Sequence, residues 1–363
     1  MTTSTDVRGI PRPFYYPNAD GIRGLACLLV LFVHATGWFF EGTRQYLPGT
    51  GKVGVWLFFV LSAFLLTNHL LRKTVTWFVA GDYIIGRVLR IVPLYLLAVV
   101  AYYALGTAGI DSASDIYTAL TFRGNYAHLW TVPVEMKFYV ILLAAIVPIA
   151  LIYRSRGAMA AGGAVAVGAT ALAFAYPFTG MAQFPTAIRW YVPCFLLGSV
   201  VACIYPAMRP RVSPKLAMAA SLVLFAIIVL LTDGIRPLLF PSLNAASWLS
   251  DKFILLGGIW TIFLVMNLEV EGAVGAILRS KVMSSIGKWS YSIYLFHWLV
   301  VVLLAHAAPG NVLVFIAAVI LAIALGAVLH WCVEKPLARL RKRIARLLRE
   351  GVDQREAHPA SGG

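Results

Sequence analysis

The sequence predicts an all-α, polytopic membrane protein with about ten transmembrane helices and both termini in the cytoplasm. Of its 363 residues, 60% are hydrophobic and only 12% are charged, and the mean hydropathy is +0.82. A soluble domain carries roughly 25% charged residues, so the composition excludes a soluble enzyme, a disordered regulator and a secreted disulfide scaffold. The apolar residues fall in long uninterrupted stretches, which is typical of membrane helices rather than of a barrel.

Ten apolar stretches supply the predicted helices in order along the chain. Each has about 16 to 22 residues, close to the roughly 20 that a helix needs to cross a bilayer. Gly and Pro interrupt several stretches, which is tolerated where neighbouring helices cover the backbone. The eighth, 253–268, is short. The stretches begin near Gly21, Val53, Arg90, Pro133, Ala158, Ala187, Pro214, Phe253, Trp289 and Val312.

The basic residues determine the predicted orientation. The chain has 30 Lys and Arg against 15 Asp and Glu, a net charge of +15. With the N-terminus in the cytoplasm, 23 of the 30 fall in cytoplasmic loops or in the C-terminal tail, and every cytoplasmic loop is positive. This bias is typical of membrane proteins. We therefore attribute the charge to topology and expect no nucleic-acid partner.

Three parts are expected: a cytoplasmic leader (1–17), one transmembrane domain (18–335) and a basic amphipathic tail (336–363). The predicted outer loops are too short for a second hydrophobic core. The tail places its apolar residues on one side of a basic helix, as in helices that lie on the cytoplasmic membrane surface. Four cysteines lie in or beside apolar stretches without ligand spacing, so neither a disulfide nor a metal site is predicted: Cys27, Cys194, Cys203 and Cys332.

The first stretch carries ionisable residues at positions where they are costly in a membrane. Arg23 and His34 are eleven residues apart. In a helix this spacing places them on one stripe, separated by about 16 Å along the axis. His34 therefore suggests a functional site, and the alternative is a core histidine hydrogen-bonded to a neighbouring helix. Asp20 suits a helix cap or a position beside Arg23.

The third and fourth stretches add charged groups. Arg87 and Arg90 are neighbours on a helix and could grip phosphate oxygens, or could serve only the topology. Glu135 is expected at the depth of His34, where a carboxylate could orient the imidazole for proton abstraction. The alternative is an ion pair between Glu135 and Lys137.

The ninth stretch places hydroxyl groups and an imidazole at mid-membrane depth. Tyr291, Ser292 and His297 could line a polar channel or could hold helices together. The sequence leaves these two interpretations open.

Six motifs together resemble the membrane-bound acyltransferase-3 family, which includes bacterial O-antigen and macrolide O-acyltransferases. They span most of the chain and occur in the family's order. Each is weak by itself, and their order makes the resemblance strong. The motifs are Asp20-Gly-Ile-Arg23-Gly with His34, Gly54-Val-Trp-Leu-Phe-Phe-Val-Leu-Ser62, Arg87-Val-Leu-Arg90-Ile-Val-Pro-Leu-Tyr, Leu129-Trp-Thr-Val-Pro-Val-Glu135, Ser290-Tyr-Ser-Ile-Tyr-Leu-Phe-His297-Trp and Val333-Glu334-Lys-Pro336.

The resemblance implies an acyl-CoA-dependent O-acyltransferase of the inner (plasma) membrane. Family members transfer acyl groups, usually acetyl, from cytosolic acyl-CoA to hydroxyl groups, often of sugars on the far side of the membrane. It implies that His34 is catalytic, that Arg23 belongs to the same motif, and that Arg87 and Arg90 serve the acyl donor. We also expect Arg23 to be a donor-binding residue and Glu135 to orient His34. The remaining candidates for lining the site are Asp20, Ser62, Trp130, Tyr291, Ser292 and His297.

The expected partners are membrane lipids, acyl-CoA as a co-substrate and a glycan, glycolipid or macrolide-type acceptor, with no permanently bound cofactor and no metal. His34 could act as a general base or could itself carry the acyl group. The alternative function is a transporter or flippase without bond chemistry, because buried Arg, His and Glu along one path would also suit transport. A purely structural role does not account for Arg23 and His34 on one buried stripe. The sequence does not indicate the oligomeric state.

Overall fold

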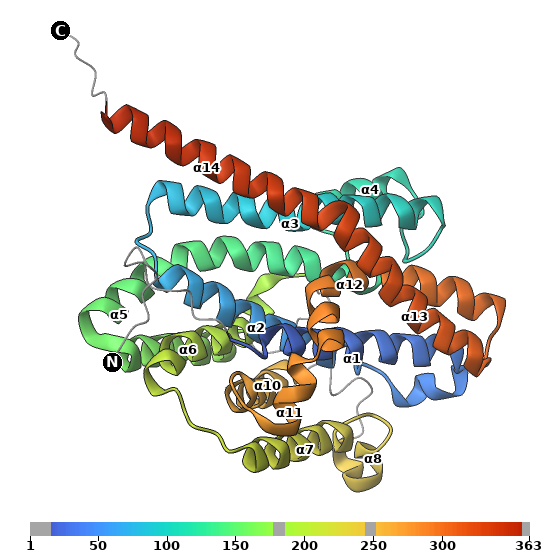
Figure 1. Cartoon of the computed structure of the whole chain (residues 1–363). Coiled ribbons are helices and arrows are strands. Elements are labelled where there is room, and N and C mark those ends of the chain that lie inside the picture. The colour runs from blue at the N-terminus through green and yellow to red at the C-terminus, as the bar shows by residue number, and fades with distance from the viewer. Residues whose placement is uncertain (1–15, 177–185, 244–251, 358–363) are drawn as a thin grey trace.

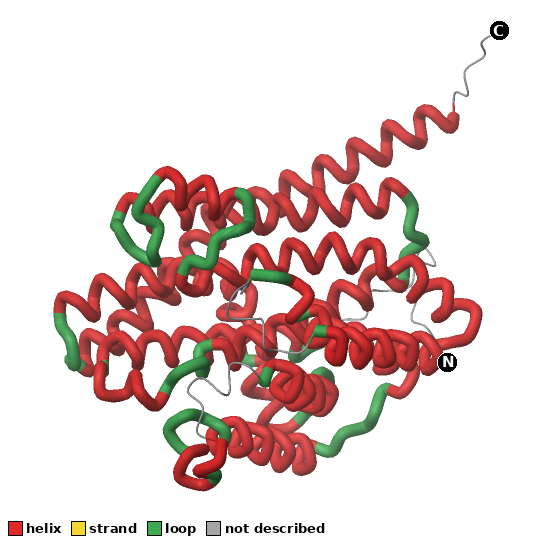
Figure 2. The backbone as a smooth tube through the Cα atoms, turned by 180° about the vertical axis from the view of Figure 1, so that it is seen from behind, coloured by secondary structure: helices red, strands yellow, loops and turns green. Residues whose placement is uncertain are grey.

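The computed structural model describes residues 16–176, 186–243 and 252–357 (Figure 1). Within these residues all regular structure is helical (Figure 2), which confirms the predicted all-α class. The predicted leader lies outside the described residues except for its last two positions, as do the final six residues of the tail.

The longer helices follow the predicted apolar stretches, and shorter helical segments lie in the connections. The longer helices are α1 (Ala19–Phe39), α2 (Lys52–Leu71), α3 (Trp77–Ala104), α5 (Thr131–Ala175), α6 (Val192–Met208), α7 (Pro214–Leu230), α10 (Phe253–Asn267), α12 (Lys281–Ala307), α13 (Val312–Leu329) and α14 (Lys335–Ala357). The short segments are η1 (Glu41–Tyr46), α4 (Ala113–Leu120), η2 (Ala127–Trp130), η4 (Ile188–Trp190), α8 (Arg236–Leu239), η5 (Pro241–Leu243), α11 (Gly272–Arg279) and η6 (His330–Glu334).

Among the described residues, six helical stretches are long and apolar enough to cross a membrane by themselves. The fourth and fifth predicted stretches form one helix, α5, whose backbone breaks at Gly157 with φ 87°. α6 and α7 have 17 residues each, and α10 forms a seventh candidate only together with α11, across a 99° bend. The chain is therefore a multi-span membrane protein, and the figure of ten spans stays a prediction.

Two helices begin well before the apolar stretches that they carry. α3 begins at Trp77 rather than near Arg90, because the Thr76 hydroxyl accepts a hydrogen bond from the first turn. α12 begins at Lys281 rather than near Trp289, with Ser280 as the equivalent cap. Hydropathy marks only the apolar part of a helix, whereas the caps mark its ends. The motif with Arg87 and Arg90 consequently lies inside α3.

α1 lies at the centre of the site-bearing part of the fold. It packs against α12 and α2, while α12 also packs against α13, and α6 packs against both α2 and α5. The main core contains large buried aromatic side chains such as Trp56, Phe195 and Trp260. Exposed aliphatic side chains cover the outward faces of other helices, as at Leu222 on α7 and Ile320 on α13, which fits a lipid environment.

The tail helix α14 continues directly from α13 through the π-helical turn η6. α14 lies alongside α3 (Figure 1), and Arg341 of α14 forms an ion pair with Asp82 of α3 at 3.0 Å. A helix is therefore present in the predicted tail, and its amphipathic character and its position on the membrane surface stay predictions.

Candidate active site

His34 of α1 is held by a second histidine. Its Nδ1 lies 2.8 Å from Nε2 of His297 on α12, and the two ring planes are within 4° of parallel. His297 is buried, whereas His34 is partly exposed. The contact joins residues 263 positions apart, and it depends on the close packing of α1 on α12.

Backbone carbonyls determine where the protons of this pair lie. Nδ1 of His297 lies 2.7 Å from the carbonyl oxygen of Tyr294 and 3.2 Å from that of Ile293. A carbonyl only accepts hydrogen bonds, so this nitrogen carries the proton, and the Nε2 lone pair of neutral His297 faces His34. The Nδ1–H of His34 therefore donates to His297. Neutral His34 is left with an unprotonated Nε2, the form that a general base requires.

The free edge of His34 faces an open cavity of about 390 Å³, which we call the histidine cavity. Gly51 also lines it, and a Cβ atom at this glycine would lie only 2.7 Å from Nε2 of His34. Aromatic rings form much of the remaining wall. The lining residues include Trp38, Trp130, Trp298, His128, Arg44 and Lys52.

Two cations extend over aromatic rings of this wall. The Arg44 guanidinium lies 4.9 Å from the Trp38 ring centre, and the Lys52 ammonium lies 5.7 Å from that of Trp130. Such contacts hold tryptophan rings in a fixed orientation. The histidine cavity therefore offers flat apolar surfaces beside the base.

His128 is a third imidazole in this cluster. Its Nε2 donates to the carbonyl oxygen of Leu295 at 3.1 Å, and its ring stacks on Trp298 at 5.5 Å. Its Nδ1 is buried without a hydrogen-bond partner. No role was predicted for His128 from the sequence, in which it stands three residues before Thr131, where α5 begins.

A second cavity, of about 310 Å³, contains all three predicted donor residues, and we call it the arginine cavity. It is built from α1, α2, α3, α5, α12 and α14. Its polar lining includes Arg23, Arg87, Arg90, Arg341, His69, Glu135, Ser62, Tyr139 and Tyr291.

The charged groups of the arginine cavity are only partly paired. Arg23 donates to Asp20 at 2.9 Å, so Asp20 is an ion-pair partner, and the residue at the N-cap of α1 is Asn18. The Glu135 carboxylate accepts a hydrogen bond from Tyr139 at 3.0 Å. Arg87 lies over the Tyr139 ring at 5.8 Å, and its buried Nε has no hydrogen-bond partner.

The two cavities occupy opposite ends of α1 and share two lining residues, Val55 and Tyr294. The Tyr294 hydroxyl donates to the carbonyl oxygen of His128 at 2.6 Å and accepts from Thr131 at 3.0 Å. These bonds hold the ring at the boundary between the two cavities.

Two sequence predictions about contacts are wrong. Glu135 does not reach His34, because it lies among the arginines while the imidazole is bonded to His297. Glu135 also forms no pair with Lys137, whose ammonium donates to the carbonyl oxygen of Thr186 at 3.0 Å. The depth of Glu135 was estimated from its distance to the start of its apolar stretch, and sequence does not show how α5 is rotated and tilted.

The other candidates divide between the two cavities. Ser62 and Tyr291 line the arginine cavity, and Trp130 lines the histidine cavity. Ser292 lines neither and instead donates to Glu334 of η6. His69 and Arg341 line the arginine cavity without having been singled out as site residues in the sequence, since their place depends on how α2 and α14 pack.

Comparison with known proteins gives one family match and several distant relatives. A family model described as an acyltransferase domain matches residues 16–331. The chain is 24% identical to "Putative O-acetyltransferase SACOL0978" of Staphylococcus aureus (strain COL) over 326 residues, covering 79% of this chain and 51% of that protein. It is 23% identical to "O-acetyltransferase OatA" of Staphylococcus aureus (strain NCTC 8325 / PS 47) over 363 residues, covering 90% of this chain and 58% of that protein. The chain thus spans about half the length of the curated relatives it matches. No solved structure is significantly similar to it.

Proposed function

The chain belongs to the acyltransferase-3 family, and from this premise we propose that it is an integral-membrane O-acyltransferase with His34 as its general base. The proposed reaction moves an acyl group from acyl-CoA to a hydroxyl group. Acetyl is the expected group, because the relatives are named O-acetyltransferases.

One observation carries this proposal: Nδ1 of His34 is hydrogen-bonded to His297, which assigns the unprotonated tautomer to Nε2, and the ring lines an open cavity. The backbone carbonyls behind His297 hold this tautomer before any substrate arrives. A base prepared in this way needs no reorganisation when the hydroxyl group binds. His297 takes the positioning role that the sequence had suggested for Glu135.

The proposed step balances without a further reactant. The acceptor oxygen attacks the thioester carbonyl carbon as Nε2 of His34 removes the hydroxyl proton. The new C–O bond forms, the C–S bond breaks, and the departing thiolate takes the proton from His34. The products are the ester and free CoA.

The arginine cavity is the proposed donor site. Arg87 and Arg90 bind the phosphates of acyl-CoA, because guanidinium groups match phosphate oxygens with paired hydrogen bonds. The slender pantetheine arm then extends past Val55 and Tyr294, which line both cavities. The thioester thereby reaches His34 from the side opposite to the acceptor.

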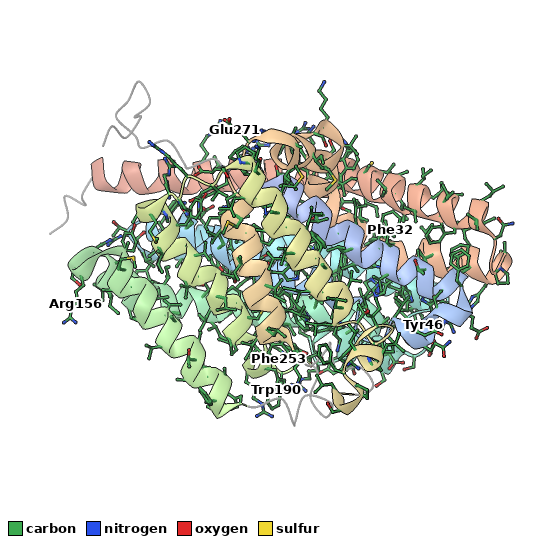
Figure 3. The ribbon with its side chains drawn as sticks, turned by 90° about the horizontal axis from the view of Figure 1, so that it is seen from below. Phe32, Tyr46, Arg156, Trp190, Phe253 and Glu271 are labelled. Carbon is green, nitrogen blue, oxygen red and sulfur yellow. The ribbon has the colours of Figure 1, made fainter. Side chains whose placement is uncertain are left out.

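We propose that the protein lies in the plasma (inner) membrane. Its proposed topology has ten spans and both termini in the cytoplasm. The excess of basic residues in alternate loops supports this orientation. Tyr46, in the loop beside the histidine cavity, and Arg156, at the break in α5, lie at opposite ends of the molecule (Figure 3). In this proposed orientation the arginine cavity opens to the cytoplasm, and the histidine cavity opens to the outside.

The proposed acceptor is a glycan, a glycolipid or a macrolide-type compound with a free hydroxyl group. Tryptophan faces beside the base support this class, since they suit the apolar faces of sugar rings. The covalent variant, in which His34 carries the acyl group, uses the same nitrogen. It would leave labelled acyl-protein when acceptor is withheld.

The test is acyl transfer by the purified protein in detergent, with labelled acetyl-CoA and extracts of surface glycans as acceptors. Detergent removes any gradient across the membrane, so transfer cannot be replaced by transport. Label on an acceptor together with free CoA supports the proposal. The transporter alternative would be established by two results together: acetyl-CoA stays intact with every acceptor fraction, and the protein moves small molecules across the membrane of vesicles.

A further inference from the structure

The tail helix contributes a cation to the arginine cavity. Arg341 of α14 lines this cavity together with Arg87 and Arg90 of α3. Asp82 accepts a hydrogen bond from its guanidinium at 3.0 Å and holds it there. More than 250 residues separate the two partners in the chain.

The backbone of α3 is shaped to receive this side chain. Gly86 lies one turn after Asp82 on the same helix. A Cβ atom at Gly86 would lie 2.6 Å from both Cζ and Nε of Arg341, closer than such atoms can approach. The absence of a side chain at this position therefore lets the guanidinium lie against α3.

The cations of this cavity outnumber their carboxylate partners. Arg23 and Arg341 are paired with Asp20 and Asp82, whereas Arg87 and Arg90 have no carboxylate within ion-pair distance in the part of the chain that the structure describes. The buried Nε of Arg87 also has no hydrogen-bond partner. A cavity with unpaired guanidinium groups is suited to an anionic ligand.

The proposed donor carries more negative charge than two arginines neutralise. Acyl-CoA has a pyrophosphate and a single ribose phosphate, and this phosphate monoester alone adds about −1.5 to −2 charges at neutral pH. Arg341 also lines this cavity, and unlike Arg23, Arg87 and Arg90 it lies outside the six family motifs. Its ion pair with Asp82 leaves donors of its forked guanidinium for a ligand.

We propose that α14 forms part of the donor site, with Arg341 binding the nucleotide phosphates of acyl-CoA. This inference rests on the proposed acyltransferase function. It gives the tail helix a role in substrate binding in addition to any contact with the membrane surface. Arg341 is predicted to act on the nucleotide end of the donor only, far from the reacting thioester.

The experiment compares two donors with the full-length protein in detergent. Acetyl-CoA carries the nucleotide phosphates, and S-acetyl-pantetheine lacks them. In Arg341→Gln, we expect the KM for acetyl-CoA to rise about tenfold or more, the range for losing hydrogen bonds to a charged group. The KM for S-acetyl-pantetheine and the kcat with both donors should stay within about twofold of wild type, because this donor lacks the groups that Arg341 binds.

Two variants on the same helix serve as controls. Arg343→Gln removes the same charge from an exposed position and should leave both KM values unchanged. Arg341→Lys keeps the positive charge and should recover part of the affinity for acetyl-CoA. Thermal unfolding of each variant identifies any loss that comes from misfolding.

The outcomes separate this inference from the function on which it rests. An equal rise in both KM values, or no rise in either, would overturn the role of Arg341 while leaving the acyltransferase function intact. An Arg341→Gln defect that appears only when anionic lipid is added would assign the arginine to a lipid headgroup and would also overturn it. Wild-type protein inactive with both donors would instead contradict the proposed function.

Discussion

The histidine cavity and the arginine cavity are similar in size, and they share Val55 and Tyr294, but they hold their polar groups differently. In the histidine cavity, hydrogen bonds fix the orientation of the His34–His297 pair. Nδ1 of His34 bonds to Nε2 of His297, and Nδ1 of His297 bonds to the carbonyl oxygen of Tyr294. In the arginine cavity, by contrast, the guanidinium groups of Arg87 and Arg90 have no carboxylate within ion-pair distance among the described residues. The histidine cavity is therefore preorganised for a single proton transfer, whereas the arginine cavity has positive charge without a negative partner.

This difference predicts different kinetic effects in the two cavities. Groups that act on the reacting atoms should change kcat, whereas groups that bind a distant part of the donor should change KM. Mutations in the histidine cavity should therefore lower the rate at saturating donor. Mutations in the arginine cavity should weaken the apparent affinity for acetyl-CoA.

The largest effect is expected at His34. His34→Gln keeps a polar side chain of similar size but removes the base, so kcat should fall by about 10² to 10⁴. The KM for acetyl-CoA should change little, because the donor phosphates bind at the other end of α1. Steady-state transfer with purified variant protein measures both constants, and a kcat near that of wild type would exclude His34 as the base.

A smaller loss is expected at His297, which positions His34 without touching substrate. His297→Leu removes the hydrogen-bond acceptor for Nδ1–H of His34, so either nitrogen of His34 can carry the proton. We therefore expect kcat to fall by about 10- to 100-fold, as for other residues that orient an imidazole. His297→Gln can still accept this bond through its amide oxygen and should retain more activity. If kcat falls equally in the two variants and its pH dependence is unchanged, His297 only packs against His34 and does not orient it.

In the arginine cavity, Arg87→Gln and Arg90→Gln should each raise the KM for acetyl-CoA by about tenfold with little change in kcat. Arg156→Gln, at the exposed break in α5, is the matched control and should be silent. Membrane orientation must be measured alongside. If only orientation changes, these arginines serve topology and do not bind the donor.

The smallest effect is expected at Gly51. Gly51→Ala would place a Cβ 2.7 Å from Nε2 of His34, which must displace the imidazole or narrow the space beside it. We expect kcat to fall a few-fold, about 1 kcal/mol in barrier. Gly42→Ala in the same loop has open space around its Cβ and should be neutral. Equal rates for the two variants would mean that the acceptor does not approach Nε2 from the Gly51 side.

The sequence predicted those features that depend on a single helix. The eleven-residue spacing places Arg23 and His34 along α1, and each lines one of the two cavities. The order of the motifs also predicted the family correctly. Periodicity and local motifs carry this information because it is independent of how the helices pack.

The features that depend on packing between distant segments were not predicted. His297 was a candidate for lining the site, but its bond to His34 requires the close crossing of α12 and α1. Arg341 reaches the arginine cavity only because Asp82 and Gly86 receive it on α3. The wrong prediction that Glu135 contacts His34 has the same cause. The hydropathy of the sequence does not show how α5 is rotated about its own axis.

The central claim is that donor and acceptor approach His34 from opposite sides of the membrane. Single cysteines at Arg90 and Lys52, in a background without the four native cysteines, can be labelled with a membrane-impermeant maleimide in vesicles of either orientation. We predict that the cysteine at position 90 reacts only in inside-out vesicles and is protected by acetyl-CoA at concentrations above the raised KM of this variant. The cysteine at position 52 should react only in right-side-out vesicles, without protection. Labelling of both positions from the same side would contradict the account.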